Sequence, residues 1–254
     1  MATSEIYTLS HIDALTVSCL ASVGVLTSST GWILETPPKK LAVIGGGAIG
    51  LEMAQIFQDF GTEVVLFEAQ DRILAEVEDE IAKNLTAILE NDPRLSVKTS
   101  VKVASISGSA GNMTLSYEES GDAHDFDCDY VIMATGKRPV TEPLKVASAG
   151  IECDGPVIKA DARCRTSVPH IFAVGDVIGG LMLAHTAGQQ GRVAAKTICG
   201  EDMKYNEAKD SGVIFTRPEA AFVGLSVAQA KAKGIDAADR KSTRPELQSR
   251  GHLV

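Results

Sequence analysis

Residues 41–68 read LAVIGGGAIGLEMAQIFQDFGTEVVLFE, and this stretch decides the fold class. The apolar run at 41–44 is typical of a strand that is buried on both faces of a parallel sheet. Apolar residues then recur at helical spacing from 51 to 60, Gly61 ends that helix, and residues 62–68 form a second strand-like run. Strand, glycine-rich turn, helix and strand within 28 residues predict a βαβ unit.

Gly45, Gly47 and Gly50 form the pattern GxGxxG between the predicted strand and the predicted helix. In a dinucleotide-binding unit the first glycine allows a tight turn, the second lets the backbone approach a pyrophosphate, and the third packs helix on strand. The amino terminus of the helix adds free N–H groups and a partial positive charge for the phosphates. The alternative is a glycine-rich turn in an unrelated α/β domain, but the register of strand, glycines, helix and second strand favours dinucleotide binding.

Glu68 lies at the end of the second predicted strand, 18 residues past Gly50. A carboxylate at this position accepts a hydrogen bond from the ribose 2′-OH of NAD(H), and it would repel the 2′-phosphate of NADP(H). No Arg or Lys follows until Arg72. The residues therefore predict NAD(H) as the cofactor, and the alternative is that Glu68 is merely a solvated side chain.

Periodicity along the rest of the chain predicts further helices and strands. They are a helix at 76–90 that Pro93 stops, antiparallel strands within 95–120, a buried strand at 127–135, short strands at 157–158 and 171–174, a helix at 185–199, a strand beginning near 213 and a short helix at 226–234. Ser226 is the expected amino-terminal cap of the last helix. Residues 240–254 show no periodicity and are expected to be frayed. The fold class is therefore α/β, with a parallel dinucleotide-binding, Rossmann-like sheet and a three-stranded antiparallel meander.

Composition and charge disfavour several classes of function. The 254 residues include 24 Lys+Arg and 33 Asp+Glu, a net charge of −9, which gives no electrostatic footprint for nucleic acid or an anionic membrane. With 44% hydrophobic and 22% charged residues, the chain is not disordered as a whole. The stretch from Ala14 to Leu26 is too short to span a bilayer and follows no basic segment, so a cytoplasmic protein without a membrane partner is expected.

The five cysteines, at 19, 128, 153, 164 and 199, are widely spaced. No CxxC pair and no zinc-type cluster is present, so the sequence predicts no metal site. A scattered, odd number of cysteines also suits a reducing compartment better than a secreted disulfide framework.

Four stretches together resemble one family: 43–74, VIMATGKRP at 131–139, TSVPHIFAVGDV with LMLAHTAGQQG within 166–191, and FTRPEAAFVGLS at 215–226. From about Val25 to Asp236 the chain resembles the FAD-dependent pyridine nucleotide-disulfide oxidoreductases, and within them the dihydrolipoamide dehydrogenase type. The resemblance implies hydride transfer between NAD(H) and FAD, a lipoamide-type disulfide or dithiol substrate, and a homodimer.

The resemblance also implies binding residues for both cofactors. Those for NAD(H) are Gly45, Gly46, Gly47, Ala48, Ile49, Gly50, Leu51 and Glu52 of the phosphate loop, Glu68 at the ribose, Val101 on the adenine side, and Gly136 where NAD meets the FAD domain. Those for FAD are Asp176 at the ribityl chain and Met182, Leu183, Ala184 and His185 at the flavin ring. Glu52 also matches a glutamate that pairs with a lysine beside flavin N5. The alternatives are that Glu52 complements the helix dipole, Asp176 forms a turn, and His185 only begins a helix.

The resemblance divides the chain into four parts. Residues 1–39 lead into the NAD(H)-binding domain at 40–127, residues 128–205 form the second half of an FAD-binding domain, and residues 206–254 begin a truncated interface domain. The chain contains a single GxGxxG, no CxxxxC pair, no lysine partner for Glu52, and no His–Glu motif at His252 or elsewhere. We therefore expect a partial chain with weak or no FAD binding, a truncated dimer interface and impaired catalysis.

Two alternatives to a dihydrolipoamide dehydrogenase-like function remain open. A related flavoprotein, of the NADH oxidase, soluble transhydrogenase or mercuric reductase type, fits the same motifs. A non-catalytic NAD(H)-binding module fits them as well, and NADH binding without electron transfer would select it.

Overall fold

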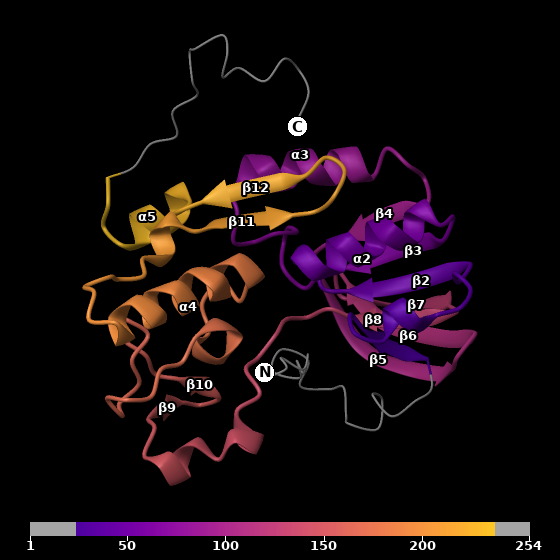
Figure 1. Cartoon of the computed structure of the whole chain (residues 1–254). Coiled ribbons are helices and arrows are strands. Elements are labelled where there is room, and N and C mark those ends of the chain that lie inside the picture. The colour runs from indigo at the N-terminus through magenta and orange to yellow at the C-terminus, as the bar shows by residue number, and fades with distance from the viewer. Residues whose placement is uncertain (1–23, 237–254) are drawn as a thin grey trace. The chain divides into compact units, whose positions relative to one another are not determined.

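The computed structural model describes residues 24–236 (Figure 1). This part of the chain divides into two compact units: a larger unit of residues 24–136 and 213–236, and a smaller unit of residues 137–212. Cys19, His252, most of the stretch from Ala14 to Leu26 and the end expected to be frayed lie outside the described residues.

A five-stranded parallel sheet forms the centre of the larger unit and contains the predicted βαβ unit. The strand order is β1 (Val25–Thr27), β8 (Tyr130–Met133), β2 (Lys40–Ile44), β3 (Glu63–Phe67) and β4 (Leu95–Lys98). Helix α2 (Ala48–Asp59) connects β2 to β3, and α3 (Asp79–Leu89) lies between β3 and β4 in the chain. Apart from a few terminal residues, the elements predicted at 41–68 and 76–90 are confirmed.

Both faces of this sheet are covered, because successive residues of a strand point to opposite sides. On one face, Leu41 and Leu66 belong to a buried cluster with side chains of α2 and α3. On the other face, Ile44 and Phe67 belong to a second cluster with the meander. Burial on both sides explains why the strands read as uninterrupted apolar runs.

The meander consists of β5 (Val101–Ser109), β6 (Asn112–Glu119) and β7 (Asp122–Cys128), which pair antiparallel in chain order. A three-stranded antiparallel meander is therefore present as predicted, but its third strand, β7, lies beyond the predicted range of 95–120. One expectation is wrong, because residues 95–98 form β4, which pairs in parallel with β3. The antiparallel strands begin only after Ser100, where a φ of 56° turns the chain out of the parallel sheet.

The smaller unit contains little regular structure. Its elements are the short 3₁₀ helices η2 (Glu142–Leu144), η3 (Val146–Ala149), η4 (Gly175–Ile178) and η5 (Glu207–Lys209), the antiparallel strands β9 (Cys153–Asp154) and β10 (Val157–Ile158), and helix α4 (Ala184–Ile198). The strand predicted at 171–174 is wrong: Phe172 makes one isolated bridge, to Arg165. An apolar run needs a neighbouring strand to pair with, and the described part of this unit offers none beside it.

The segment after the smaller unit returns to the larger one. The division between the units falls within β11 (Ser211–Ile214), after Gly212, and the chain then forms β12 (Ala220–Val223) and α5 (Val227–Ala232). Ser226 caps α5 as predicted, because its hydroxyl accepts from the Gln229 N–H while the Gln229 side chain accepts from the Ser226 N–H. Ile214 and Ala220 are buried in the same cluster as α2 and α3.

Candidate functional site

The glycine loop joins β2 to α2 at the carboxyl end of the parallel sheet. Gly45 has a φ of +111°, and a Cβ atom there would lie 2.4 Å from the carbonyl oxygen of Ala134. A Cβ on Gly50 would lie 1.8 Å from the carbonyl oxygen of Gly45, whereas a Cβ on Gly47 would meet no atom within 4 Å. The fold itself therefore requires Gly45 and Gly50, while Gly47 faces open space through which a ligand can approach the backbone.

Helix α2 presents free N–H groups beside that open space. In the described chain, the amides of Ala48, Ile49 and Gly50 have no acceptor within hydrogen-bonding reach, and the Leu51 N–H is the first to bond, to the Gly47 carbonyl at 3.1 Å. The first turn contains no acidic side chain. Unpaired amides at the positive end of a helix dipole suit an anionic phosphate.

Glu68 is held beside the loop by two backbone amides. Its Oε2 accepts from the Gly46 N–H at 2.6 Å, and its Oε1 accepts from the Gln70 N–H at 2.8 Å. A carboxylate offers about four lone-pair directions, so two remain for a ligand. The structure thus brings the predicted ribose acid into direct contact with the predicted phosphate loop.

Val101 and Gly136 lie at the same edge of the sheet as this loop. The Val101 N–H donates to the Glu68 carbonyl at 3.1 Å, and its side chain is buried. Gly136 lies shortly after β8 and two residues after Ala134, whose carbonyl faces Gly45, and it adopts a φ of +138°. The candidate residues of the larger unit therefore gather along the carboxyl ends of adjacent parallel strands, where α/β sheets bind ligands.

The guanidinium of Arg72, the first cation after Glu68, is already engaged. It donates to the carbonyls of Ala75 at 2.8 Å and Val77 at 3.2 Å, and it lies 3.7 Å from the Asp79 carboxylate. These partners hold Arg72 as a brace for the chain leading into α3. Such a brace is poorly suited to pair with a 2′-phosphate.

Glu52 has a role that sequence reasoning missed. It lies beyond the first turn of α2, so the interpretation as a residue of that turn that complements the helix dipole is wrong. Its Oε1 instead accepts from the Phe215 N–H at 2.9 Å. The two residues are 163 positions apart. No periodicity or motif signals a contact of this kind.

The residues predicted to meet FAD lie in the smaller unit, around η4 and the start of α4. Asp176 is half-buried in η4, and its carboxylate bonds to no other described side chain or amide. Met182 adopts a φ of +46°, Leu183 is the N-cap residue of α4, and Ala184 is its first residue. His185 is exposed, and its Nε2 lies 2.6 Å from the Ser211 carbonyl oxygen.

This arrangement fits part of an FAD site. The hydroxyl of Thr186 is buried and has no hydrogen-bond partner, and the carboxylate of Asp176 is also unpaired within residues 24–236. The Gly175 N–H donates to Oε1 of the buried Gln190 at 2.7 Å, which fixes the loop that carries Asp176. Unpaired donors and acceptors around a helix amino terminus suit the ribityl hydroxyls and the polar edge of a flavin ring.

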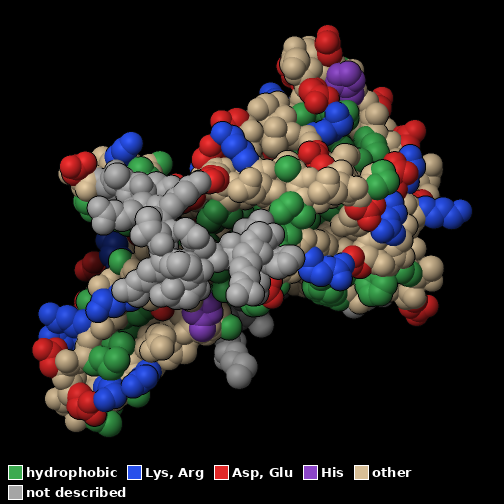
Figure 2. All heavy atoms as spheres, turned by 90° about the horizontal axis from the view of Figure 1, so that it is seen from above, with side chains coloured by type: hydrophobic (Ala, Val, Ile, Leu, Met, Phe, Trp, Pro, Cys, Tyr) green, Lys and Arg blue, Asp and Glu red, His purple; other side chains and the backbone are tan. Residues whose placement is uncertain are grey.

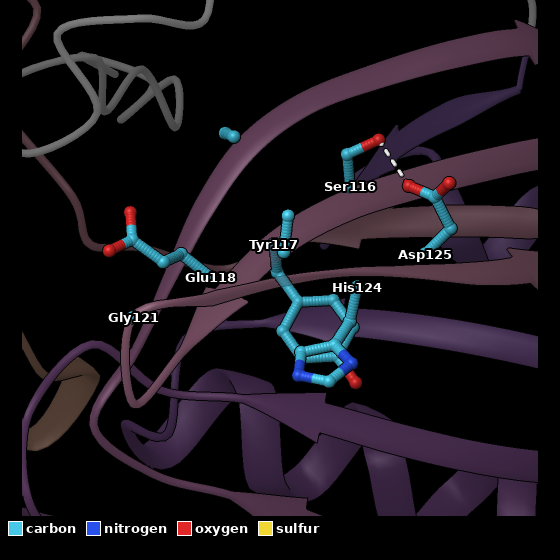
Figure 3. Close-up of a pocket in the computed structure, with 8 residues that line it drawn as sticks. Ser116, Tyr117, Glu118, Gly121, His124 and Asp125 are labelled. Atoms are coloured by element: carbon cyan, nitrogen blue, oxygen red, sulfur yellow. Dashed lines mark hydrogen bonds between the residues drawn. The ribbon is translucent and has the colours of Figure 1, made fainter.

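A separate hollow lies on the meander (Figure 3). The rings of Tyr117 and His124 stack with centroids 5.4 Å apart, and the Ser116 hydroxyl donates to Asp125 at 2.6 Å. Tyr117 and Ser116 are neighbours in one strand, so their side chains point to opposite faces of the sheet, as Figure 3 shows. The side chains do not converge on a common point, and we assign no site there.

Other site chemistry is sparse in the described chain. Residues 24–236 contain no group of three or more His, Cys, Asp and Glu arranged to hold a metal ion. None of the helices within the same range has the length and apolar character needed to cross a membrane. On the face that Figure 2 draws, acidic and basic side chains are interspersed rather than gathered by sign.

Comparison with known families decides what the chain is related to. The sequence model of the pyridine nucleotide-disulphide oxidoreductase family matches residues 8–191. The chain belongs to this family. The resemblance seen in the sequence is thereby confirmed, and the family is one of oxidoreductases.

Members of this family with curated names are similar over most of the chain. Dihydrolipoyl dehydrogenase from Bacillus subtilis (strain 168) is 38% identical over 213 residues, which are 84% of this chain and 45% of that protein. The dihydrolipoyl dehydrogenase of Pseudomonas aeruginosa is 35% identical over 212 residues, again 84% of this chain and 45% of that protein. The chain thus spans about half the length of the curated relatives that it matches.

Solved structures of flavoproteins share the fold. The HOCl-induced flavoprotein disulfide reductase RclA from Escherichia coli matches with a TM-score of 0.80 and 26% identity over 93% of this chain and 53% of that one. A FAD-dependent pyridine nucleotide-disulphide oxidoreductase from Desulfovibrio vulgaris matches with a TM-score of 0.72 and 29% identity over 85% of this chain and 59% of that one. The predicted α/β fold class is confirmed.

Proposed function

We propose that this chain binds NAD(H) through the loop at 45–50 and Glu68, as the nucleotide-binding part of a dihydrolipoyl dehydrogenase-like oxidoreductase. One observation carries the proposal: Gly47 faces open space beside unpaired helix amides, and the Glu68 carboxylate is tied to the same loop. The amides would bind the pyrophosphate, Gly47 would let it approach, and Glu68 would accept from the ribose hydroxyls. Val101 and Gly136 would line the two ends of the nucleotide.

The smaller unit would supply the flavin side of the reaction. Asp176 would accept hydrogen bonds from the ribityl chain, and the backbone at 182–185 would meet the ring. Bound FAD supplies the acceptor for a hydride from NADH and the route to a disulfide. Family membership supports this role and a homodimer, and the name of the relatives, dihydrolipoyl dehydrogenase, supports a lipoamide-type substrate.

The described residues do not by themselves provide the step from flavin to disulfide. The four cysteines at 128, 153, 164 and 199 are free, and no two of them have the CxxxxC spacing. We therefore propose that this chain alone binds NADH without reducing lipoamide. The alternative of a non-catalytic NAD(H)-binding module rests on the same observation.

A binding titration tests the nucleotide site. Trp32 is the single tryptophan of the chain, belongs to the larger unit and is 59% exposed, so its fluorescence can pass energy to bound NADH. We expect saturable quenching in the wild type. Gly47→Ala should keep the fold, because its Cβ meets no atom, but it should weaken NADH binding by about tenfold or more by obstructing the pyrophosphate.

Gly188→Ala is the matched control for this substitution. Gly188 is also a glycine with open space around its missing Cβ, but it lies in α4 of the smaller unit. The control should bind NADH as the wild type does. Equal affinity in all three proteins would contradict the assignment of the glycine loop.

An absorption spectrum then distinguishes a chain that only binds NAD(H) from one that also binds flavin and passes a hydride to it. We expect the purified chain to carry no flavin band, because Asp176 and residues 182–185 would contact only the ribityl chain and the ring of FAD. Flavin bands that NADH bleaches without oxygen would instead show both sites assembled and hydride transfer intact. Tightly bound flavin that NADH cannot bleach would contradict NAD(H) binding at the loop.

A further inference from the structure

Three side chains in successive turns of α2 bind residues 215–217, two of them through main-chain groups. Glu52 accepts from the Phe215 N–H at 2.9 Å. The Gln55 amide donates to the Arg217 carbonyl at 3.1 Å and accepts from the Arg217 N–H. Asp59 pairs with the Arg217 guanidinium. A single face of the helix thus binds main-chain groups of a segment more than 150 residues away in sequence.

Apolar contacts and a second anchor extend this attachment. Ile214 and Ala220 are buried in the cluster formed with α2 and α3, and Phe222 packs against that cluster. The Val227 N–H donates to the carboxylate of Glu78, the residue before α3. We call residues 213–227 the strap, and all of them belong to the larger unit.

Gln55 is the residue of α2 that engages the strap at two points. Its side chain is 9% exposed, and the Arg217 N–H and carbonyl are the partners of its amide. Removing the amide would leave both backbone groups of Arg217 without that partner. An unsatisfied, partly buried backbone group is costly, so the strap should detach from α2 more readily.

The same helix presents its amino terminus to the proposed pyrophosphate. Glu52 lies four residues after Ala48, about 6 Å along the helix axis. A carboxylate at that distance disfavours a bound dianion, and the bond from Phe215 both turns it toward the strap and offsets part of its charge. Release of the strap would leave this carboxylate free near the phosphates.

We infer that docking of the strap on α2 and NAD(H) binding at the glycine loop are energetically coupled, with Gln55 as the positioning residue. This inference rests on the proposed function. By linkage, if the docked strap strengthens NADH binding, then bound NADH must stabilise the docked strap by the same factor. A purely structural role for Gln55 would not produce that reciprocity.

The test combines NADH titration by Trp32 fluorescence with hydrogen exchange of peptides covering 213–227, in the full chain. Gln55→Leu preserves size and removes both bonds. We expect it to weaken NADH binding by about fivefold, which is at the low end of measured couplings, and to speed exchange of the strap. In the wild type, saturating NADH should slow exchange of the strap by a similar factor.

Two further variants complete the design. Gln55→Glu keeps the acceptor for the Arg217 N–H, should retain part of the coupling, and carries the test if Gln55→Leu does not fold. Glu219→Gln is the control: Glu219 is exposed in the same segment and forms no hydrogen bond or ion pair with α2, so NADH affinity should be unchanged.

The outcomes separate this inference from the proposed function. NADH binding that is equal in wild type, Gln55→Leu and Gln55→Glu, with strap exchange insensitive to NADH, would overturn the coupling and leave the nucleotide site intact. No NADH binding by the wild type would overturn the proposed function and the coupling with it. The coupling would be established if the factor by which Gln55→Leu weakens NADH binding agreed with the factor by which NADH slows exchange of the strap in the wild type.

Discussion

The two units of the chain differ in how they bury apolar surface. In the larger unit, a parallel sheet is covered on both faces by extended clusters, one with α2, α3 and the strap and one with the meander. The described part of the smaller unit has a cluster of only three buried residues, Cys164, Val193 and Ala194. Because stability depends on buried apolar area, the larger unit should be the part that holds its structure, and its site should be the better preorganised of the two.

The largest expected effect is a difference between two identical substitutions. Val64 on β3 and Val193 on α4 are 1% and 2% exposed, respectively. Val64→Ala should cost about 2 kcal/mol or more of unfolding free energy, because the transfer and cavity terms add in a tightly packed core. Val193→Ala should cost about 1 kcal/mol or less, since fewer buried neighbours surround it.

Trp32 allows the comparison to be made for one unit at a time. It belongs to the larger unit, so its fluorescence during denaturant unfolding reports on that unit. Val64→Ala should lower the midpoint of the Trp32 transition, and Val193→Ala should leave it in place. A similar shift of the Trp32 midpoint in both variants would show that the units unfold together and that the contrast between their cores does not govern stability.

The same contrast decides what could be predicted from the sequence. The βαβ unit at 41–68 and the glycine loop were predictable, because burial on both faces and helical periodicity leave strong patterns in the residues themselves. Strand β7 was not identified, since Asp122–Cys128 is mostly polar and exposed and only Cys128 is buried. The strand expected at 171–174 failed in the smaller unit because apolar character does not supply a pairing partner.

No pattern in the sequence predicts contacts between distant segments. The bonds from Glu52 and Gln55 to the strap join residues 163 and 162 positions apart, and each involves a main-chain group whose direction depends on the tertiary fold. The direction of β4 could not be predicted either, because the alternating residues at 95–98 suit a parallel neighbour as well as an antiparallel one. Only the turn at Ser100 separates the two sheets.

An intermediate effect concerns the choice between NADH and NADPH in the larger unit. Glu68→Ala removes the proposed ribose acceptor and the bond to the Gly46 N–H, so NADH binding should weaken by about tenfold. The Glu68→Ala variant should not bind NADPH as tightly as the wild type binds NADH, because Arg72 is held by two carbonyls and Asp79 and is not free to bind the 2′-phosphate. Titration of both nucleotides by Trp32 fluorescence measures the two affinities.

Arg72→Ala is the companion variant for this experiment. It should lower the stability of the larger unit while leaving NADPH binding as weak as before, since the guanidinium serves as a brace. The opposite result would be that Glu68→Ala binds NADPH as tightly as the wild type binds NADH, and that adding Arg72→Ala to this variant abolishes the gain. The guanidinium would then be available to a 2′-phosphate, and the structural role of Arg72 would be contradicted.

The smallest expected effect compares a buried cysteine of the larger unit with an exposed one of the smaller unit. Burial raises the pKa of Cys128 from 9.0 to about 11. A thiol whose pKa is raised by folding stabilises the folded state fully below pH 9 and loses that contribution as the pH rises toward 11. Cys199 is exposed at the end of α4.

Cys128→Ala should therefore flatten the fall in stability between pH 9 and pH 11, although the substitution lowers stability at neutral pH by opening a small cavity. Cys199→Ala should leave the slope as in the wild type. The Trp32 unfolding midpoint, measured across this range for the three proteins, gives the slopes, and other titrating groups cancel because all three share them. Equal slopes for Cys128→Ala and the wild type would mean that the thiolate is tolerated at this position, so that water reaches the end of β7 and the second core cluster is less closed than its packing indicates.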